Sequence, residues 1–483
     1  VIVALCGALC GLALARPGGG DSYSGGGGHG GGGGDGDGDG AVAIFELLYW
    51  LVRLTIEVPQ VGLPLIGIVL GWVAFSAYKK HQNKDWDSGP PVGLKRQITL
   101  EELRALDPDF SQLVFEDFVF RLFATAHRAR RSPESLATVA PYVSAAARTA
   151  LASRPPVGQA VESVVIGAMR TYQVLVPEDP TTGRVQIGIE FEANVTTAQQ
   201  TYFTVESWLF ARDATRTSKP PGATRGFPCP NCGAPWQATA TGTQVCASCG
   251  EVVDNGRFDW IVETITLRST DTRPPTLTTE VPERGTDLPT YRAPDADDRW
   301  LELQQSDPTL TEAAFGARLD MIYRELHRAW AANELAPARG LLSDGLFDYL
   351  QYWIDAYRAQ GLRNHLVDMR ILHTTYAKLA RDRWYDAITV RIWATGHDYV
   401  VREADGEIVR GSQRRERKYS EYWTLIRAAS RKGAPIASPS CSNCGAPLQI
   451  SMTGACEHCG AHVTAGEFDW VLSKIEQDDS YRD

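Results

Sequence analysis

A pattern of four cysteines followed by the tripeptide Phe-Asp-Trp occurs twice in this chain. Each copy contains two Cys-x-x-Cys-Gly turns, and each turn directs two thiols to one point because the glycine lets the backbone curl behind them. Four thiolates arranged in this way are the ligand set of a structural zinc ion. The pattern therefore predicts two such sites, with the ligands Cys229, Cys232, Cys246 and Cys249 in the first copy and Cys441, Cys444, Cys456 and Cys459 in the second.

Two other states compete with structural zinc. The cysteines could pair as disulfides, or they could hold a catalytic zinc ion, although four sulfur ligands leave no open position for a substrate. The remaining two of the ten cysteines, Cys6 and Cys10, lie in an apolar leader. We expect zinc ribbons at residues 227–251 and 439–463, with Zn²⁺ as the cofactor of both.

The repetition extends beyond the cysteines. Asp107-Pro108 recurs as Asp307-Pro308 at an offset of 200, and Glu206-Ser-Trp208 recurs as Glu421-Tyr-Trp423 at an offset of 215. Offsets that drift slowly around one value indicate a duplicated domain with small insertions and deletions in its loops. Solenoid repeats are far shorter, so we expect a tandem pair.

Three segments precede the duplicated region. Residues 1–15 are apolar and end in Ala13-Leu-Ala15, and Arg16 follows, so we expect residues 1–16 to form a signal peptide or an N-terminal anchor. Residues 17–40 are rich in glycine and aspartate, which predicts a disordered linker. In 41–78, we expect an amphipathic segment followed by one transmembrane helix over 61–78, with a two-span hairpin as the alternative.

The charges that flank the expected span set its orientation. Lys79 and Lys80 follow it directly, whereas the linker before it carries aspartates. The positive-inside rule then places the chain after residue 79 in the cytoplasm. The net charge of −10 argues against nucleic acid as a partner, because nucleic-acid binding needs a basic surface.

The remainder of the chain is expected to form two units. The first unit spans 97–268 and the second 299–477, with a Pro- and Thr-rich linker over 269–298. In each unit, helical periodicity comes first and strand alternation follows, and the ribbon precedes the last strand. The predicted fold class is α+β, with two tandem cone-like domains whose helices pack on a curved antiparallel sheet.

The second unit resembles a known family. Leu362-Arg-Asn364, Tyr385–Val390, Asp398-Tyr399 and Tyr419–Ile426 resemble the Tim44-like domain, which is named for the membrane-associated tether of the mitochondrial import motor. The resemblance covers roughly 300–476 well and 100–268 weakly. It implies a cone of the nuclear-transport-factor-two-like class. The glycine-rich segment and the membrane stretch also resemble those of bacterial members of this family, so we expect a location in the bacterial inner membrane.

Catalysis would require acid and base groups that line one cone. The best candidates, Asp368, His373 and Tyr376, with His365 nearby, lie on one predicted strand. Strict period-two alternation puts Asp368 and Tyr376 on one face and His365 and His373 on the other, so no acid–base pair forms. We therefore do not expect an enzyme.

Aromatic residues supply the expected core, and a few could line a pocket for a peptide or an acyl chain: Trp353, Tyr357, Trp384, Trp393 and Trp423. We expect an inner-membrane-anchored adaptor that binds a protein partner or the membrane surface through its cytoplasmic cones. The alternative is a cone that binds or transforms a small molecule.

Overall fold

The computed structural model describes the greater part of both units and scattered positions before them. Between residues 100 and 481 it omits 222, 224, 225, 238–243, 273–276, 278–282, 284, 448, 451–454, 462, 465, 479 and 480. The described positions before residue 100 are 53, 55, 57–61, 63–67, 71, 72 and 74.

The chain divides into two bodies, 28–87 and the rest, and each is described by itself. The predicted leader 1–16 and linker 17–40 lie outside the described residues, and the predicted membrane segment 41–78 is described only in part. Its described positions are helical except at Val58, and Leu63 and Trp72 are exposed. Among the described residues, none of the helices has both the length and the apolar character needed to cross a membrane.

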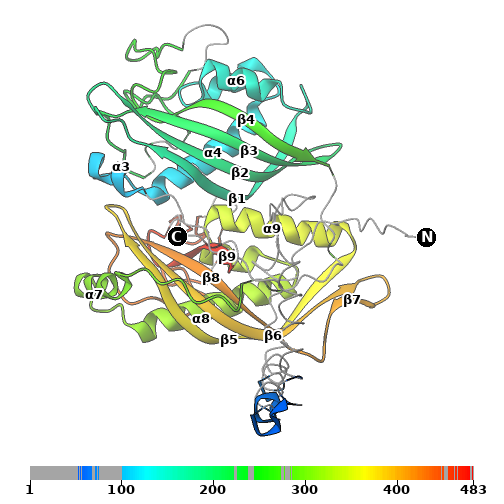
Figure 1. Ribbon diagram of the computed structural model, residues 1–483. Helices are drawn as coiled ribbons and strands as arrows, with labels where there is room; N and C mark the ends of the chain where they lie inside the picture. The colour runs from blue at the N-terminus through cyan, green and yellow to red at the C-terminus, as the bar shows by residue number, and fades with distance from the viewer. Residues whose placement is uncertain are drawn as a thin grey trace. The chain divides into compact units, whose positions relative to one another are not determined.

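The first unit begins with helices and continues with four strands (Figure 1). Ser111 starts the main helix, because its hydroxyl accepts a hydrogen bond from the backbone N–H of Val114 at 3.2 Å. The elements are α3 (Glu101–Leu106), α4 (Gln112–Ala129), α5 (Pro133–Leu136), the 3₁₀ turn η2 (Ala137–Val139), α6 (Ala145–Ala152), β1 (Val161–Leu175), β2 (Arg184–Thr197), β3 (Thr201–Asp213) and β4 (Ile261–Asp271).

The second unit repeats this order of elements, except that it has no counterpart of α5 and has an additional short strand, β7. Thr311 and Ser343 cap its two long helices in the way that Ser111 caps α4. The elements are α7 (Ala296–Ser306), α8 (Glu312–Ala331), the 3₁₀ helix η3 (Ala336–Leu341), α9 (Asp344–Ala359), β5 (Leu362–Arg381), β6 (Tyr385–Arg402), β7 (Ile408–Gly411), β8 (Arg417–Ala428) and β9 (Val471–Gln477).

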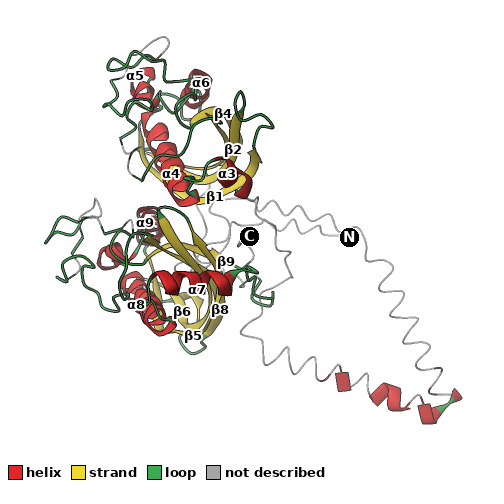
Figure 2. Ribbon diagram, turned by 90° about the vertical axis from the view of Figure 1, so that its left-hand side faces the viewer, coloured by secondary structure: helices red, strands yellow, loops and turns green. Residues whose placement is uncertain are grey.

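Both sheets are antiparallel. The first has the order β1-β2-β3-β4, and the second has the order β5-β6-β8-β9 with β7 paired to β6. Helices pack against the sheet of each unit (Figure 2). This arrangement confirms the predicted α+β class. The cysteine-containing segments leave the sheets between β3 and β4 and between β8 and β9, so each one precedes a final strand, as expected.

Each unit has its own apolar core. In β2, the alternating residues Val185, Ile187, Ile189 and Phe191 are buried against α4, which contributes Phe115, Phe118 and Leu122. In the second unit, Trp330, Trp353 and Trp423 are fully buried together. Burial of each large apolar side chain contributes about 1.5–3 kcal/mol, so these two clusters provide the main stabilisation of the units.

The two units also contact each other. Helix α9 contacts β1, and the Lys474 ammonium lies 2.7 Å from the Glu116 carboxylate. The indole N–H of Trp384 donates to the backbone oxygen of Asp109 at 3.3 Å. Trp384 was expected in the core of the second unit, but it is half-buried and contacts the first unit instead.

Candidate metal centres

The four Cys-x-x-Cys-Gly turns share one backbone geometry. In each turn, the N–H of the glycine donates to the carbonyl of the first cysteine, at 2.8–2.9 Å. These glycines have positive φ angles between 71° and 75°, a conformation that side chains disfavour, as the sequence pattern predicts: Gly233, Gly250, Gly445 and Gly460. The turns bring the predicted ligands together in two clusters.

The sulfur positions fit a tetrahedral metal centre. Within each cluster, all four Sγ atoms lie within 4.8 Å of one another. Among these separations are 3.8 Å for Cys232–Cys246 and 3.9 Å for Cys229–Cys249 in the first cluster, and 4.0 Å for Cys444–Cys456 and 3.9 Å for Cys441–Cys459 in the second. Sulfurs about 2.3 Å from a tetrahedral zinc ion are about 3.8 Å apart, whereas a disulfide requires about 2.05 Å. The eight cysteines are therefore arranged as ligands and not as disulfides.

Hydrogen-bond donors favour the thiolate at one sulfur of each cluster, whereas burial raises the pKa of Cys229 to about 12. Burial acts to raise the pKa of Cys246, but the backbone amides of Cys249 and Ser248 outweigh it and lower that pKa to about 6. In the second cluster, the backbone N–H of Ala461 and the side chain of Asn443 lower the pKa of Cys459, also to about 6. Thiolates are the form that binds zinc, so Cys246 and Cys459 are the sulfurs of the two clusters that these donors prepare for a divalent cation.

The Phe-Asp-Trp tripeptide joins each ribbon to its core. Trp260 and Trp470 are buried, and each receives a guanidinium over its ring, from Arg212 at 4.6 Å and from Arg427 at 4.7 Å. The aspartate of each tripeptide accepts a hydrogen bond from the backbone N–H of the tryptophan that follows it, at 2.8 Å. These contacts explain why the tripeptide follows both ribbons.

The repeated Asp-Pro pairs complete the same arrangement. Asp107 lies 2.7 Å from Arg212, and Asp307 lies 3.0 Å from Arg427, and all four side chains are buried. Burial acts to raise the pKa of Asp307, but hydrogen bonds from Thr309 and Gly433 and the charge of Arg427 outweigh it and lower that pKa. A buried ion pair thus links the start of each unit to the strand that precedes its ribbon.

The first ribbon has additional contacts with its helices. The indole N–H of Trp236 donates to the carbonyl of Ala137 at 2.9 Å, and the hydroxyl of Tyr142 donates to the carbonyl of Pro228 at 3.0 Å. In the second ribbon the sequence has Leu448 in the place of Trp236, and leucine has no hydrogen bond to donate. The attachments of the two ribbons therefore differ.

Each unit also holds a buried histidine, which the sequence reasoning did not identify. In the first unit, Nε2 of His127 lies 3.4 Å from Oε2 of Glu206, which also accepts from the Trp208 indole at 2.9 Å. Burial acts to raise the pKa of Glu206, but His127, Trp208 and Arg154 outweigh it and lower that pKa. The His-Arg-Ala tripeptide occurs at His127 and again at His327, and this repetition was the feature of the sequence that could have identified the two histidines.

The second unit surrounds its histidine with hydroxyl groups. Nδ1 of His327 lies 2.7 Å from the Tyr323 carbonyl and therefore donates to it. Nε2 lies 3.3 Å from the Tyr419 hydroxyl, and the hydroxyls of Tyr419 and Tyr323 are 2.6 Å apart. Phe123 and Thr204 replace these two tyrosines in the first unit, where the histidine faces a carboxylate instead.

The predicted geometry of β5 is only partly correct. His365 and His373 pair with Tyr399 and Trp393 on one face of β6, as alternation predicts. Asp368, however, lies in a β-bulge with a φ of 54°, and its carboxylate is 4.0 Å from His397 on that same face. In the described part of the chain, no interaction joins Asp368 to His373, which contacts Thr375 at 3.1 Å.

Three of the five singled-out aromatic residues lie in the core. Trp353, Tyr357 and Trp423 are buried, as expected. Trp393 is half-buried and lies outside the core, with Arg391 over its ring at 4.8 Å and His373 at 5.2 Å between ring centroids. A peptide or acyl pocket lined by Trp393 would therefore lie on the outer face of the sheet.

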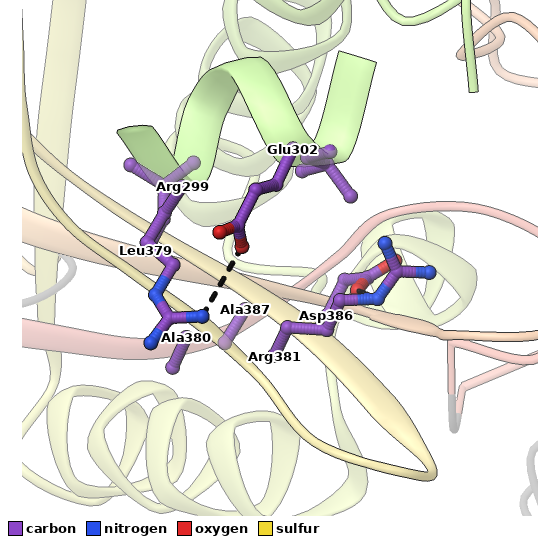
Figure 3. Close-up of a pocket in the computed structure, with 8 residues that line it drawn as sticks. Arg299, Glu302, Leu379, Ala380, Arg381, Asp386 and Ala387 are labelled. Carbon is purple, nitrogen blue, oxygen red and sulfur yellow. Dashed lines mark hydrogen bonds and ion pairs between the residues drawn. The ribbon is translucent and has the colours of Figure 1, made fainter. Parts of the chain in front are cut away.

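A small pocket lies between α7 and the β5–β6 hairpin, away from the cysteine clusters (Figure 3). Arg299 contacts Glu302 at 3.1 Å, and Arg381 lies 3.2 Å from Asp386. Burial raises the pKa of Asp386, although Arg381 and Arg427 oppose this effect. Because its charges already pair within the pocket, they offer little to an additional ligand.

The fold and these clusters define an α+β protein with two antiparallel sheets and two tetracysteine sites. Residues 300–436 match the family model of the Tim44-like domain, which confirms the resemblance predicted for the second unit. In general, this family comprises non-catalytic, membrane-associated scaffolds or adaptors. The match ends before Cys441, so it does not bear on either metal centre. No curated protein matches the chain.

Proposed function

We propose that this protein is a membrane-anchored adaptor whose two α+β units form cones that arose by duplication and bind a protein partner. The observation that carries this proposal is the Tim44-like match over 300–436. The predicted segment 41–78 supplies the anchor, and the basic residues after it favour a cytoplasmic location at the bacterial inner membrane. The exposed apolar side chains of Leu63 and Trp72 support this role of the segment.

The two tetracysteine clusters would each hold a structural zinc ion. The sulfur separations of 3.8–4.0 Å support this assignment. A bound zinc ion would supply a cross-link between the two knuckles of a ribbon, in a segment with only a small core of its own. Four protein sulfurs complete a tetrahedral shell, so the metal would stabilise the fold and would not contact a substrate.

The partner would contact the outer side of the second sheet. Tryptophans fill the interior of this unit, whereas Val367 and Leu372 on the edge strand β5 are 41% and 51% exposed. Both lie in the matched Tim44-like region, and the half-buried Trp393 pairs across the strands with His373, the residue that follows Leu372. A protein partner with an apolar contact surface would cover these side chains.

The experiment is capture of partners by crosslinking in intact membranes, followed by pulldown of the full chain. Leu372→Glu should reduce capture at least about tenfold, because a charge would be placed in an apolar contact. Leu301→Glu is the matched control, since Leu301 is 54% exposed on α7, and this variant should capture normally. Equal capture by both variants would refute the proposed surface.

The alternative function, a cone that binds or transforms a small molecule, has one supporting observation. Buried His127 and Glu206 lie together in the first unit, with Arg154 3.9 Å from the same carboxylate. Buried ionisable groups of this kind are also found in active sites. His127→Gln distinguishes the two: a folded variant that still captures the partner supports the adaptor, whereas a folded variant without cellular function supports the alternative.

A further inference from the structure

An asparagine lies at the same position of both ribbons, directly before the second cysteine. The residue before it differs, proline at 230 and serine at 442. Its side chain does not face the knuckle in which it lies. Nδ2 of Asn231 lies 3.5 Å from the Sγ of Cys249, and Nδ2 of Asn443 lies 3.4 Å from the Sγ of Cys459. Each amide therefore donates an N–H to a sulfur of the opposite knuckle.

The sulfur that receives this hydrogen bond belongs to the fourth cysteine in both ribbons. Cys249 is half-buried and Cys459 is exposed, as are the second cysteines Cys232 and Cys444, whereas the first and third cysteines of each cluster are buried. Water can therefore reach the fourth thiolate and can compete with the metal for it. An amide donor stabilises the thiolate against protonation and fixes its direction, both of which oppose its release from a metal.

We infer that Asn231 and Asn443 are positioning residues that hold the fourth thiolate in each zinc shell and slow the release of the metal. The inference rests on the zinc centres proposed above and adds two residues to them. The cysteine pattern does not require asparagine at these positions, because the second knuckles have Ser248 and His458 there. Loss of such a supporting hydrogen bond costs about 10- to 100-fold in metal affinity.

The test uses the purified full chain, loaded with zinc, and follows transfer of zinc to a chromogenic chelator. Asn443→Asp keeps the shape of the side chain but replaces the N–H donor by an oxygen that repels the thiolate. This variant should release one of its two zinc ions at least about tenfold faster, with the other at the wild-type rate. His458→Ala, a change at the exposed corresponding position of the opposite knuckle, is the control and should release both ions at the wild-type rate.

A spectroscopic measurement distinguishes positioning from general loosening. With Co²⁺ in place of zinc, the sulfur-to-metal charge-transfer band of Asn443→Ala should move to lower energy, because the sulfur lone pair loses its donor. The band of His458→Ala should not move. If Asn443→Ala takes up no cobalt, the same band is measured for Asn231→Ala. The first ribbon is also held by the hydrogen bond of Trp236, so its site should still form in that variant.

The outcomes separate the inference from the proposal on which it depends. A wild-type chain that binds neither zinc nor cobalt would refute the metal centres themselves. A wild-type chain that binds two ions, with asparagine variants that match it in both release rate and band position, would overturn the role of the asparagines and leave the zinc centres standing.

Discussion

At the scale of single residues, the stability of the second unit depends on the buried ion pair between Asp307 and Arg427. Asp307→Asn should lower the free energy of unfolding at pH 7 by about 3 kcal/mol, because it removes the nearer of the two carboxylates that face a buried guanidinium. Asp295→Asn removes an exposed partner of Arg299 and should cost under about 1 kcal/mol. Urea denaturation followed by tryptophan fluorescence measures both.

The same pair predicts the direction of the pH effect. The pKa of Asp307 is lowered in the folded state. The carboxylate therefore stabilises the fold fully at a pH above its unfolded-state pKa, and this stabilisation is lost as the pH falls through its folded-state pKa. The wild-type chain should therefore lose more stability than Asp307→Asn on acidification below about pH 4. Parallel acid dependence of the two chains would contradict this assignment.

Single cysteines test the metal centres. The wild-type chain should contain two zinc ions, and Cys444→Ser should contain one, because three sulfurs bind zinc far more weakly than four. The sheets should persist, since their cores lie outside the ribbon. Elemental analysis and far-UV circular dichroism measure these outcomes. A zinc-free wild-type chain whose eight ribbon cysteines form disulfides would refute both metal centres.

At the scale of elements, the two ribbons should differ in local opening. Trp236→Leu removes the hydrogen bond to Ala137 and introduces the residue that the second ribbon has at this position. We expect hydrogen exchange of the Gly233 and Gly250 amides to accelerate about tenfold, the consequence of losing about 1.4 kcal/mol of local stability. The amides of Gly445 and Gly460 are the internal control and should not change.

Elements also show what the sequence could and could not predict. The knuckles were predictable because cysteine spacing and glycine conformation act within a few residues, and the structure has both as expected. Asp368 was assigned to the wrong face because a bulge adds a residue to β5 and breaks its alternation. His127 and Glu206 lie on α4 and β3, so their contact depends on tertiary packing, although the repeated His-Arg-Ala tripeptide marked the position.

At the scale of the whole molecule, the orientation in the membrane can be tested directly. The uncharged run 61–78, followed by Lys79 and Lys80, should cross the membrane once and leave Asp483 in the cytoplasm. A reporter enzyme that is active only outside the cytoplasm should be silent when fused after Asp483. Activity of that fusion would favour the two-span hairpin and place both ribbons on the other side of the membrane.

The insertion of a ribbon between paired strands also bears on how the sheet closes as the chain folds. Strands β8 and β9 are neighbours, but residues 429–470 separate them along the chain, and a metal bridge from Cys441 to Cys459 would shorten that connection by less than half. The loop-closure entropy saved is only about 0.5 kcal/mol, since a doubling of loop length costs about 0.6 kcal/mol. Sheet closure therefore depends little on zinc, and a cell short of zinc would still complete its sheets while the inserts between the strands unravel.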